Sequence, residues 1–224
     1  MVKYTDKIKY LLLVLIFFSW WAVFAPVMAG EDFHLAPETL DKTEAKYGQE
    51  ARARLIAWED LIIREAHQPD LEKLVLVNDF FNRLEFVDDI LHWGEKDYWA
   101  TPIEFIGSRG GDCEDFSIAK YFTLKAMGID EEKLNLTYVK AINYNVSHMV
   151  LTYLTVPGAE PLVLDNLVGE IKPASERTDL LPIYSFNGKG LWLARQRGQG
   201  RLTGSSIGLQ RWQELIQRMS GDNF

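Results

Sequence analysis

One short stretch limits what this chain can fold into, and it contains the only cysteine. Gly110-Gly111 leads directly into Asp112-Cys113-Glu114-Asp115, where a helical pattern of apolar residues begins. The glycine pair ends the element before it, and Gly128 is a typical residue to end the new helix. The sequence therefore predicts a helix over Cys113–Met127 whose first turn carries a thiol among three carboxylates.

The composition of the chain is that of an ordinary globular protein. Of its 224 residues, 47% are hydrophobic and 25% are charged, which is enough for one domain with a sizeable core. The net charge of -8 argues against a nucleic-acid partner. A single cysteine excludes an intrachain disulfide and a cysteine-rich zinc site.

The N-terminus has the layout of a secretory signal peptide. Lysines precede an apolar run from Leu11 to Phe24 that carries no charge. Pro26 then breaks the run, and Val27-Met28-Ala29 places small residues at the −3 and −1 positions of a cleavage site. We therefore predict a signal peptide over residues 1–29, cleaved on export, and one mature domain over residues 30–224.

An uncleaved N-terminal anchor is the alternative, because the run from Tyr10 to Ala25 is nearly long enough to span a bilayer. The cleavage motif after a helix breaker favours removal of the leader, and with it any direct insertion into the membrane. In an oxidising exported compartment, the lone cysteine is then inert, intermolecular or functional.

Helical spacing dominates the first half of the mature chain. The pattern predicts helix from Glu38 to about Ala66 with a break at Gly48, and a further helix from Asp70, as N-cap, to about Leu84. Residues 86–99 are irregular and rich in aromatic side chains. Thr101-Pro102-Ile103-Glu104 is a strong helix start, with a capping box and a proline at the first helical position.

The pattern changes after Gly128 to strands rich in Leu, Val, Thr and Tyr. Helices followed by a sheet give an α+β order. We expect an antiparallel meander of at least three strands, further strands beyond it, a flexible connection and a closing amphipathic helix. The predicted strands are Leu134–Ile142, Ser147–Thr155 and Pro161–Leu164, with others over Ile171–Trp192 around a turn at Asn187-Gly188; the connection is Gly198–Gly204, and the helix is Ser206–Met219, with Leu209, Trp212 and Ile216 on one side.

A cysteine in the first turn of a helix suits nucleophilic catalysis. The helix dipole and its free N–H groups favour the thiolate, and the backbone N–H of Cys113 is a natural oxyanion donor. Of the four histidines, only His148 lies inside a predicted strand, where a rigid element can aim its ring. Asp165 ends the next strand, so antiparallel pairing would bring its carboxylate to the imidazole.

Each of these residues also has an ordinary structural explanation. A single cysteine is often a small buried hydrophobe, a strand histidine is often half-buried, and an aspartate at a strand end is often a turn former. The conjunction of all three favours a catalytic triad of Cys113, His148 and Asp165.

Asp112, Glu114 and Asp115 argue against simple thiol catalysis, because nearby negative charges raise the pKa of a thiol. They are either a solvated helix start or ligands of a cation that neutralises them. Calcium suits carboxylate oxygens better than zinc does, and zinc would consume the nucleophile.

Four segments together resemble the bacterial transglutaminase-like cysteine proteinases, and among them the LapG-type periplasmic proteases. The resemblance implies a papain/transglutaminase-like fold with Cys113 as nucleophile, His148 as base and Asp165 as orienting acid. It also implies Ca²⁺ dependence, with Asp112 and Glu114 as ligands and Asp115 as a third. The segments are Asp97–Phe105, Gly110–Asp115, Ser147–Val150 and Leu164–Asn166.

Proteases of this group cut a large cell-surface adhesin near its N-terminus, after a pair of alanines, and so release cells from a biofilm. The periplasmic domain of an inner-membrane cyclic-di-GMP receptor sequesters them. The resemblance therefore implies a periplasmic, calcium-dependent cysteine endopeptidase, and the leader agrees with that location.

Two other functions remain open on the residues alone. The same triad could transfer the acyl group to an amine, as a transglutaminase or amidase does, since only the acceptor differs. The fold could also persist as a non-catalytic module that binds a receptor and holds calcium structurally, although the retained triad speaks against this.

Overall fold

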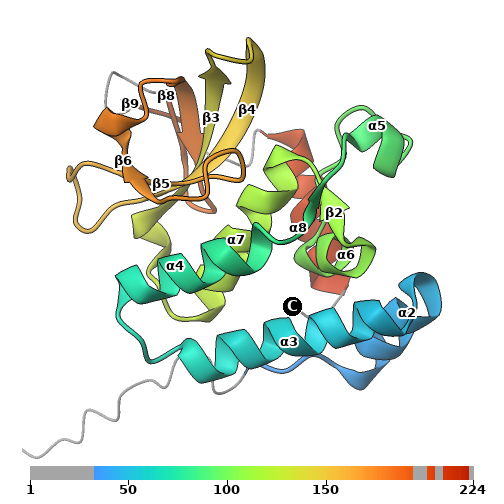
Figure 1. Cartoon of the computed structure of the whole chain (residues 1–224). Helices are drawn as coiled ribbons and strands as arrows, with labels where there is room; N and C mark the ends of the chain where they lie inside the picture. Colours follow the sequence, from blue (N-terminus) through green and yellow to red (C-terminus); the bar gives the residue numbers. More distant parts are fainter. Residues whose placement is uncertain (1–32, 194–200, 205–208, 222–224) are drawn as a thin grey trace, which may run out of the picture.

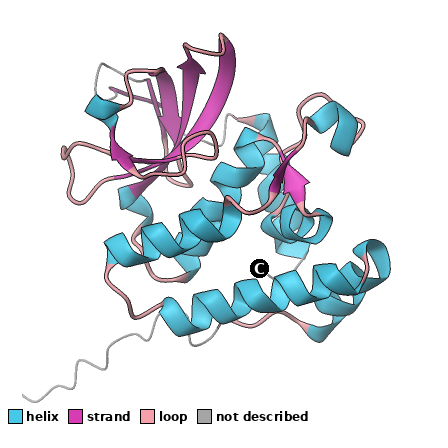
Figure 2. Cartoon of the chain, viewed as in Figure 1, coloured by secondary structure: helices cyan, strands magenta, loops and turns pink. Residues whose placement is uncertain are grey.

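The structure, a computed structural model, describes residues 33–193, 201–204 and 209–221 (Figure 1). The predicted signal peptide over residues 1–29 lies outside these ranges. Among the described helices, none is both long and apolar enough to cross a membrane. The large sheet and most of the helices occupy separate parts of the molecule, as Figure 2 shows, and this confirms the α+β prediction.

The first three described helices precede the strands, and the first two of them lie on the side of the molecule away from the sheet (Figure 1). The three helices are α2 (Pro37–Tyr47), α3 (Gln49–Glu65) and α4 (Asp70–Phe81). The break at Gly48 is confirmed: its φ of 88° lies in the left-handed region that glycine adopts readily. One side of α3 packs into the hydrophobic core through Leu55, Trp58 and Ile62, among others.

The prediction that Asp70 caps α4 is wrong. Pro69 is the N-cap, and Asp70 is the first helical residue. Its Oδ2 instead accepts hydrogen bonds from Nζ of Lys133 at 2.7 Å and from the hydroxyl of Tyr153 at 2.8 Å. Tertiary partners therefore take the carboxylate that a local pattern assigned to the cap. The helix also ends at Phe81, three residues before the predicted Leu84.

The segment between α4 and the cysteine contains small elements: β1 (Glu85–Phe86), α5 (Asp89–His92), α6 (Pro102–Ser108) and β2 (Gly110–Gly111). Strands β1 and β2 pair in parallel, so the two ends of the segment between them, which contains the aromatic residues, lie side by side. The predicted capping box of α6 is confirmed by both reciprocal hydrogen bonds between Thr101 and Glu104. The short helix α5 was not predicted.

Helix α7 (Cys113–Ala126) is the central element of the fold. It lies between the sheet and the other helices (Figure 1), and nearly all of its side chains are buried. The predicted end is confirmed, because Gly128 follows the C-cap Met127 with a φ of 85°.

The sheet has the strand order β6-β5-β4-β3-β7-β8-β9, with every neighbouring pair antiparallel. The predicted meander is confirmed as β3, β4 and β5, and the later strands lie on both of its edges. Arg201–Gly204 pairs with β8 as a strand, so the predicted flexible connection is wrong at these residues. The bounds are β3 (Leu134–Ala141), β4 (Val146–Tyr153), β5 (Leu162–Leu164), β6 (Lys172–Pro173), β7 (Leu180–Phe186), β8 (Leu191–Leu193) and β9 (Arg201–Gly204).

The last helix, α8 (Gln210–Gly221), also packs on the core. Trp212, Leu215 and Met219 are buried, whereas Ile216 is 37% exposed. The predicted side through Ile216 is therefore wrong, because the helix buries the stripe at i, i+3 and i+7 from Trp212.

Candidate active site

The helix start around Cys113 is built by close backbone approaches that only glycine allows. A Cβ on Gly110 would lie 2.8 Å from the carbonyl oxygen of Glu85, and one on Gly111 would collide with the carboxylate of Asp115. That carboxylate caps the helix, since its Oδ2 accepts the N–H of Asp112 at 3.3 Å. Cys113 is consequently the first residue of α7, as predicted, and is partly buried.

The N-terminus of α7 packs on the sheet at a part of β4 that lies beyond the end of β5. Strand β5 ends at Leu164, opposite Leu151 of β4, so the Met149 peptide lies beyond the last β4–β5 pair. Helix α7 bonds to the backbone there: the carbonyl of Met149 accepts the hydroxyl of Ser117 at 3.0 Å, and the N–H of Met149 lowers the pKa of the Cys113 thiol. The thiol therefore lies near the peptide group that joins His148 to Met149.

His148 and Asp165 form the predicted contact. His148 Nε2 lies 2.7 Å from Oδ1 of Asp165, and the two residues are only 3% and 1% exposed. The same Oδ1 accepts the N–H of Leu167 at 3.0 Å, which fixes the turn after β5. An ionised carboxylate at Nε2 holds the ring proton there and leaves Nδ1 as the basic nitrogen.

Arg177, which sequence reasoning missed, completes the surroundings of Asp165. It follows the 3₁₀ turn Ala174–Glu176, and its Nη2 donates to Oδ2 of Asp165 at 2.7 Å and to Asp179 at 2.8 Å. Burial by itself would raise the pKa of Asp165. The bond to His148, the N–H of Leu167 and the Arg177 guanidinium outweigh burial and lower that pKa to about 2.

Two of the predicted metal ligands, Asp112 and Glu114, lie beside the thiol, and the third, Asp115, forms a second group with Asp112 and with Asp89 of α5. Oε2 of Glu114 accepts the thiol hydrogen of Cys113 at 3.1 Å. Carboxylate oxygens of Asp89, Asp112 and Asp115 all lie within 4.8 Å of one another. Asp89 comes from the irregular aromatic segment, where no local signal separates it from its neighbour Asp88.

The sequence model of the bacterial transglutaminase-like cysteine proteinases matches residues 46–192. The chain belongs to this family. LapG from Legionella pneumophila has a similar structure, with a TM-score of 0.71 and 42% identity over 81% of this chain and 96% of that one. A calcium-bound structure of that LapG gives a TM-score of 0.70 at 43% identity, with 81% and 98% covered. Its EGTA-treated structure gives 0.72 at 43% identity, with 81% and 96% covered.

No curated protein sequence matches the chain significantly. Membership of the transglutaminase-like family makes this chain a cysteine peptidase with the predicted fold. The comparison also bears on the acidic residues. A relative with the same architecture has been described both with calcium and after treatment with a chelator.

Two carboxylate oxygens of this family member have no partner in the described part of the chain. Oδ1 of Asp89 and Oδ1 of Asp112 are buried without a hydrogen bond. Burial raises the pKa of Asp112 to about 9, with a further rise from Glu114, and burial raises that of Asp89 to about 6. Unpaired, buried carboxylate oxygens in one cluster fit a hard divalent cation such as Ca²⁺.

Asp115, the third predicted ligand, also has a structural part in this cluster. Its Oδ1 accepts the N–H of Ala100 at 2.7 Å, and its Oδ2 accepts that of Asp112. Asp115 is fully buried, and these two hydrogen bonds tie the start of α7 to the segment before α6. Its oxygens lie in the cluster and retain lone pairs, but they are already held by backbone groups.

The thiol itself is not activated by the helix alone. Burial raises the pKa of Cys113 well above its ordinary value, the charges of Glu114 and Asp112 raise it further, and the N–H of Met149 opposes them. The prediction of a lowered thiol pKa from the helix dipole is thus wrong for the metal-free chain. The opposing prediction, from the neighbouring acids, gives the right direction, although burial is the largest cause of the rise.

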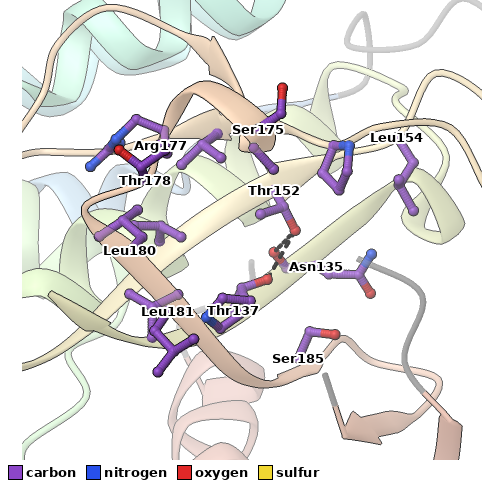
Figure 3. Close-up of a pocket in the computed structure, with 16 residues that line it drawn as sticks. Asn135, Thr137, Thr152, Leu154, Ser175, Arg177, Thr178, Leu180, Leu181 and Ser185 are labelled. Carbon is purple, nitrogen blue, oxygen red and sulfur yellow. Dashed lines mark hydrogen bonds between the residues drawn. The ribbon is translucent and has the colours of Figure 1, made fainter. Parts of the chain in front are cut away.

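A cavity of about 500 Å³ lies along the sheet face that His148 shares with Val139 and Val150 (Figure 3). Its wall is largely apolar and hydroxyl-bearing, with the Thr137 and Thr152 hydroxyls 2.9 Å apart. Arg177 also lines the cavity, and its Nη2 donates to Asp165.

Proposed function

We propose that this chain is a calcium-dependent cysteine endopeptidase with Cys113 as nucleophile, His148 as general base and Asp165 as orienting acid. The observation that carries the proposal is the packing of the start of α7 against β4, beyond the end of β5. There the N–H of Met149 acts on the thiol, and the preceding His148 is held by Asp165 at 2.7 Å. Family membership supports the reaction class.

The reaction follows from these positions. Nδ1 of His148 takes the thiol proton, and the thiolate of Cys113 attacks the carbonyl carbon of the substrate peptide. As the tetrahedral intermediate collapses, the imidazolium gives this proton to the leaving amine and the C–N bond breaks. Water, deprotonated by His148, then attacks the thioester, so that a carboxylic acid leaves and the thiol is restored.

Asp165 and Arg177 support His148 through this cycle. The carboxylate stabilises the imidazolium that forms twice per turnover, and it keeps the ring in one tautomer. Arg177 keeps that carboxylate ionised and gives its second oxygen a fixed partner.

Calcium would be held by the predicted ligands Asp112, Glu114 and Asp115, with Asp89 as a further ligand beside Asp112 and Asp115. The unpaired oxygens of Asp89 and Asp112 support this assignment. When bound, the cation would neutralise the carboxylates that hold the thiol pKa high. Glu114 would then cease to be the acceptor of the thiol hydrogen, which leaves the proton to His148.

The biological substrate and partner follow from the resemblance to LapG-type proteases. We infer that the leader over residues 1–29 is removed and that the single domain over residues 30–224 acts in the periplasm. Its substrate would be a large surface adhesin, cut near its N-terminus after two alanines, which releases biofilm attachment. The periplasmic domain of an inner-membrane cyclic-di-GMP receptor would sequester it.

The test is cleavage of a purified N-terminal adhesin fragment that contains an Ala-Ala pair, in the presence of calcium. The wild-type chain should cut it once, and Cys113→Ala should not, while the variant keeps its fold and its calcium affinity. A fragment whose alanine pair is replaced serves as the matched substrate control. Cleavage by the alanine variant would remove Cys113 from the mechanism.

A labelled primary amine in the same reaction separates hydrolysis from acyl transfer. Stable incorporation of the amine without chain cleavage would contradict the endopeptidase proposal and favour a transglutaminase. Receptor binding with no reaction under any calcium concentration would favour the non-catalytic module.

A further inference from the structure

Lys120 is a buried amine for which the proposed reaction has no use. It lies on α7 seven residues after Cys113, about 10 Å along the helix axis, and is only 1% exposed. Burial lowers its pKa to about 7, against the charges of Asp165 and Asp79. An amine is costly to bury unless its N–H groups are satisfied, so its partners define what it does.

Those partners are two asparagine side chains at the end of α4. Nζ of Lys120 donates to Oδ1 of Asn78 and to Oδ1 of Asn82, both at 2.8 Å. A neutral amine keeps two N–H groups, so both hydrogen bonds persist whether or not Lys120 carries a proton.

The lysine thereby fixes which way each amide faces. An amide has its acceptor on one side and its donors on the other, and both oxygens here point to Nζ. Nδ2 of Asn82 consequently donates to the carbonyl of Asp165 at 2.9 Å, and Nδ2 of Asn78 donates to the carbonyl of Gly169 at 2.7 Å. A flipped amide would set an NH₂ group against the amine and an oxygen against a carbonyl.

We propose that Lys120 is a positioning residue for the peptidase reaction, which holds the Asp165–Gly169 segment through Asn78 and Asn82 so that the Asp165 carboxylate meets His148. The proposal rests on the proposed role of Asp165. Asp165 is then held at two points: Arg177 bonds its carboxylate, and Lys120 holds its backbone carbonyl through Asn82. One helix then carries both the nucleophile and the support of the acid.

A buried lysine could also serve stability alone, and Lys73 is the matched control for that alternative. It is 6% exposed, and its Nζ donates to the carbonyl of Met127 at the far end of α7, at 2.8 Å. Lys73→Met therefore removes a buried amine of the same kind that does not contact Asn78, Asn82 or the Asp165–Gly169 segment.

The experiment compares Lys120→Met and Lys73→Met in the calcium-loaded chain. We expect Lys120→Met to lower kcat about 10- to 100-fold with KM within about twofold, since small misplacements of catalytic groups cost rates of this order. Lys73→Met should keep the wild-type kcat. A wild-type kcat in Lys120→Met, or an equal loss in both variants, would overturn the proposal.

A proton NMR signal provides a second readout that does not depend on turnover. The His148 Nε2–H that donates to Asp165 should resonate far downfield in the wild type and in Lys73→Met, and should shift or broaden in Lys120→Met. If wild type cleaves nothing, the proposed function fails while this signal still tests the positioning. An unchanged signal in Lys120→Met would contradict it.

Asn82→Leu is the companion variant should Lys120→Met fold poorly. It removes the donor to the Asp165 carbonyl and leaves Lys120 with Asn78. We expect a similar loss of kcat, and a double variant no worse than the poorer single one, because both changes break the same chain of contacts. Independent, multiplying losses would show that Lys120 does not act through Asn82.

Discussion

The strand side and the helix side of the proposed site differ in how their charges are compensated. On the strand side, both oxygens of Asp165 have partners, from His148, Leu167 and Arg177. On the helix side, Asp89 and Asp112 each have a buried oxygen with none, and the thiol hydrogen goes to an acid. The protein therefore finishes one half of the site itself and leaves the other half to a cation.

The strand side, which orients His148, is thus set by folding, whereas the reactivity of the thiol on the helix side depends on its neighbouring acids. The half that orients the base can form as soon as the chain folds, because both oxygens of its buried carboxylate are bonded to other residues. The half that carries the nucleophile is poised against reaction until its acids are neutralised. Each experiment below disturbs one half and uses the other as its reference.

Removal of calcium should have the largest effect. Each unit by which the thiol pKa exceeds the ambient pH lowers the thiolate population tenfold, so we expect EGTA to slow cleavage by at least about 100-fold. Calcium should restore the rate better than magnesium, which demands a stricter octahedral site. Initial rates at fixed concentrations of each free ion measure this, and equal rates in chelator would remove calcium from the mechanism.

Arg177→Met should have the next largest effect, now on the strand side. It leaves the Asp165 carboxylate buried with one charged partner fewer, which should cost about 3 kcal/mol of unfolding free energy. Urea denaturation with saturating calcium measures this. Arg52 is the matched control, because it also pairs with two acids, Asp41 and Glu44, but at the surface. Arg52→Met should cost less than about 1 kcal/mol, and equal losses would contradict the comparison.

The smallest effect is a pH dependence that differs between the halves. In the chelated protein, Asp89 and Asp112 have folded pKa values raised to about 6 and about 9. A raised pKa in an acid means that the folded state binds the proton more tightly, so stability is greatest at low pH and falls as pH rises through these values. Asp165, lowered to about 2, does the opposite and loses its contribution only in acid.

Unfolding of the chelated chain between about pH 5 and 9 should therefore show stability that declines as the pH rises. Calcium should abolish the decline, and Asp112→Asn should remove its alkaline part. Parallel pH profiles with and without calcium would mean that these carboxylates do not bind the ion.

Local patterns predicted the parts of the site that local interactions build. The capping box at Thr101, the start of α7 at Cys113 and the neighbouring strands of His148 and Asp165 all depend on residues close in sequence. The contact between His148 and Asp165 could be predicted because two adjacent strands bring these residues together.

The residues that tune these groups could not be predicted in the same way. Asp89, Arg177 and Lys120 obtain their parts from contacts between separate elements, and each looks ordinary beside its own neighbours. Asp70 fails for the same reason, since Lys133 and Tyr153 take the carboxylate that its position assigned to a helix cap. Tertiary partners override local preference wherever a charge is buried.

The register of β5 against β4 limits how the loop before β5 can change. The loop over residues 155–160 is mostly exposed, and such hairpin loops ordinarily accept extra residues. An insertion absorbed by the loop should be harmless here too. One that slid β5 by a single residue would turn every side chain of the strand to the other face, so that Asp165 would point away from His148. Variation in this surface loop is therefore constrained in register rather than in length.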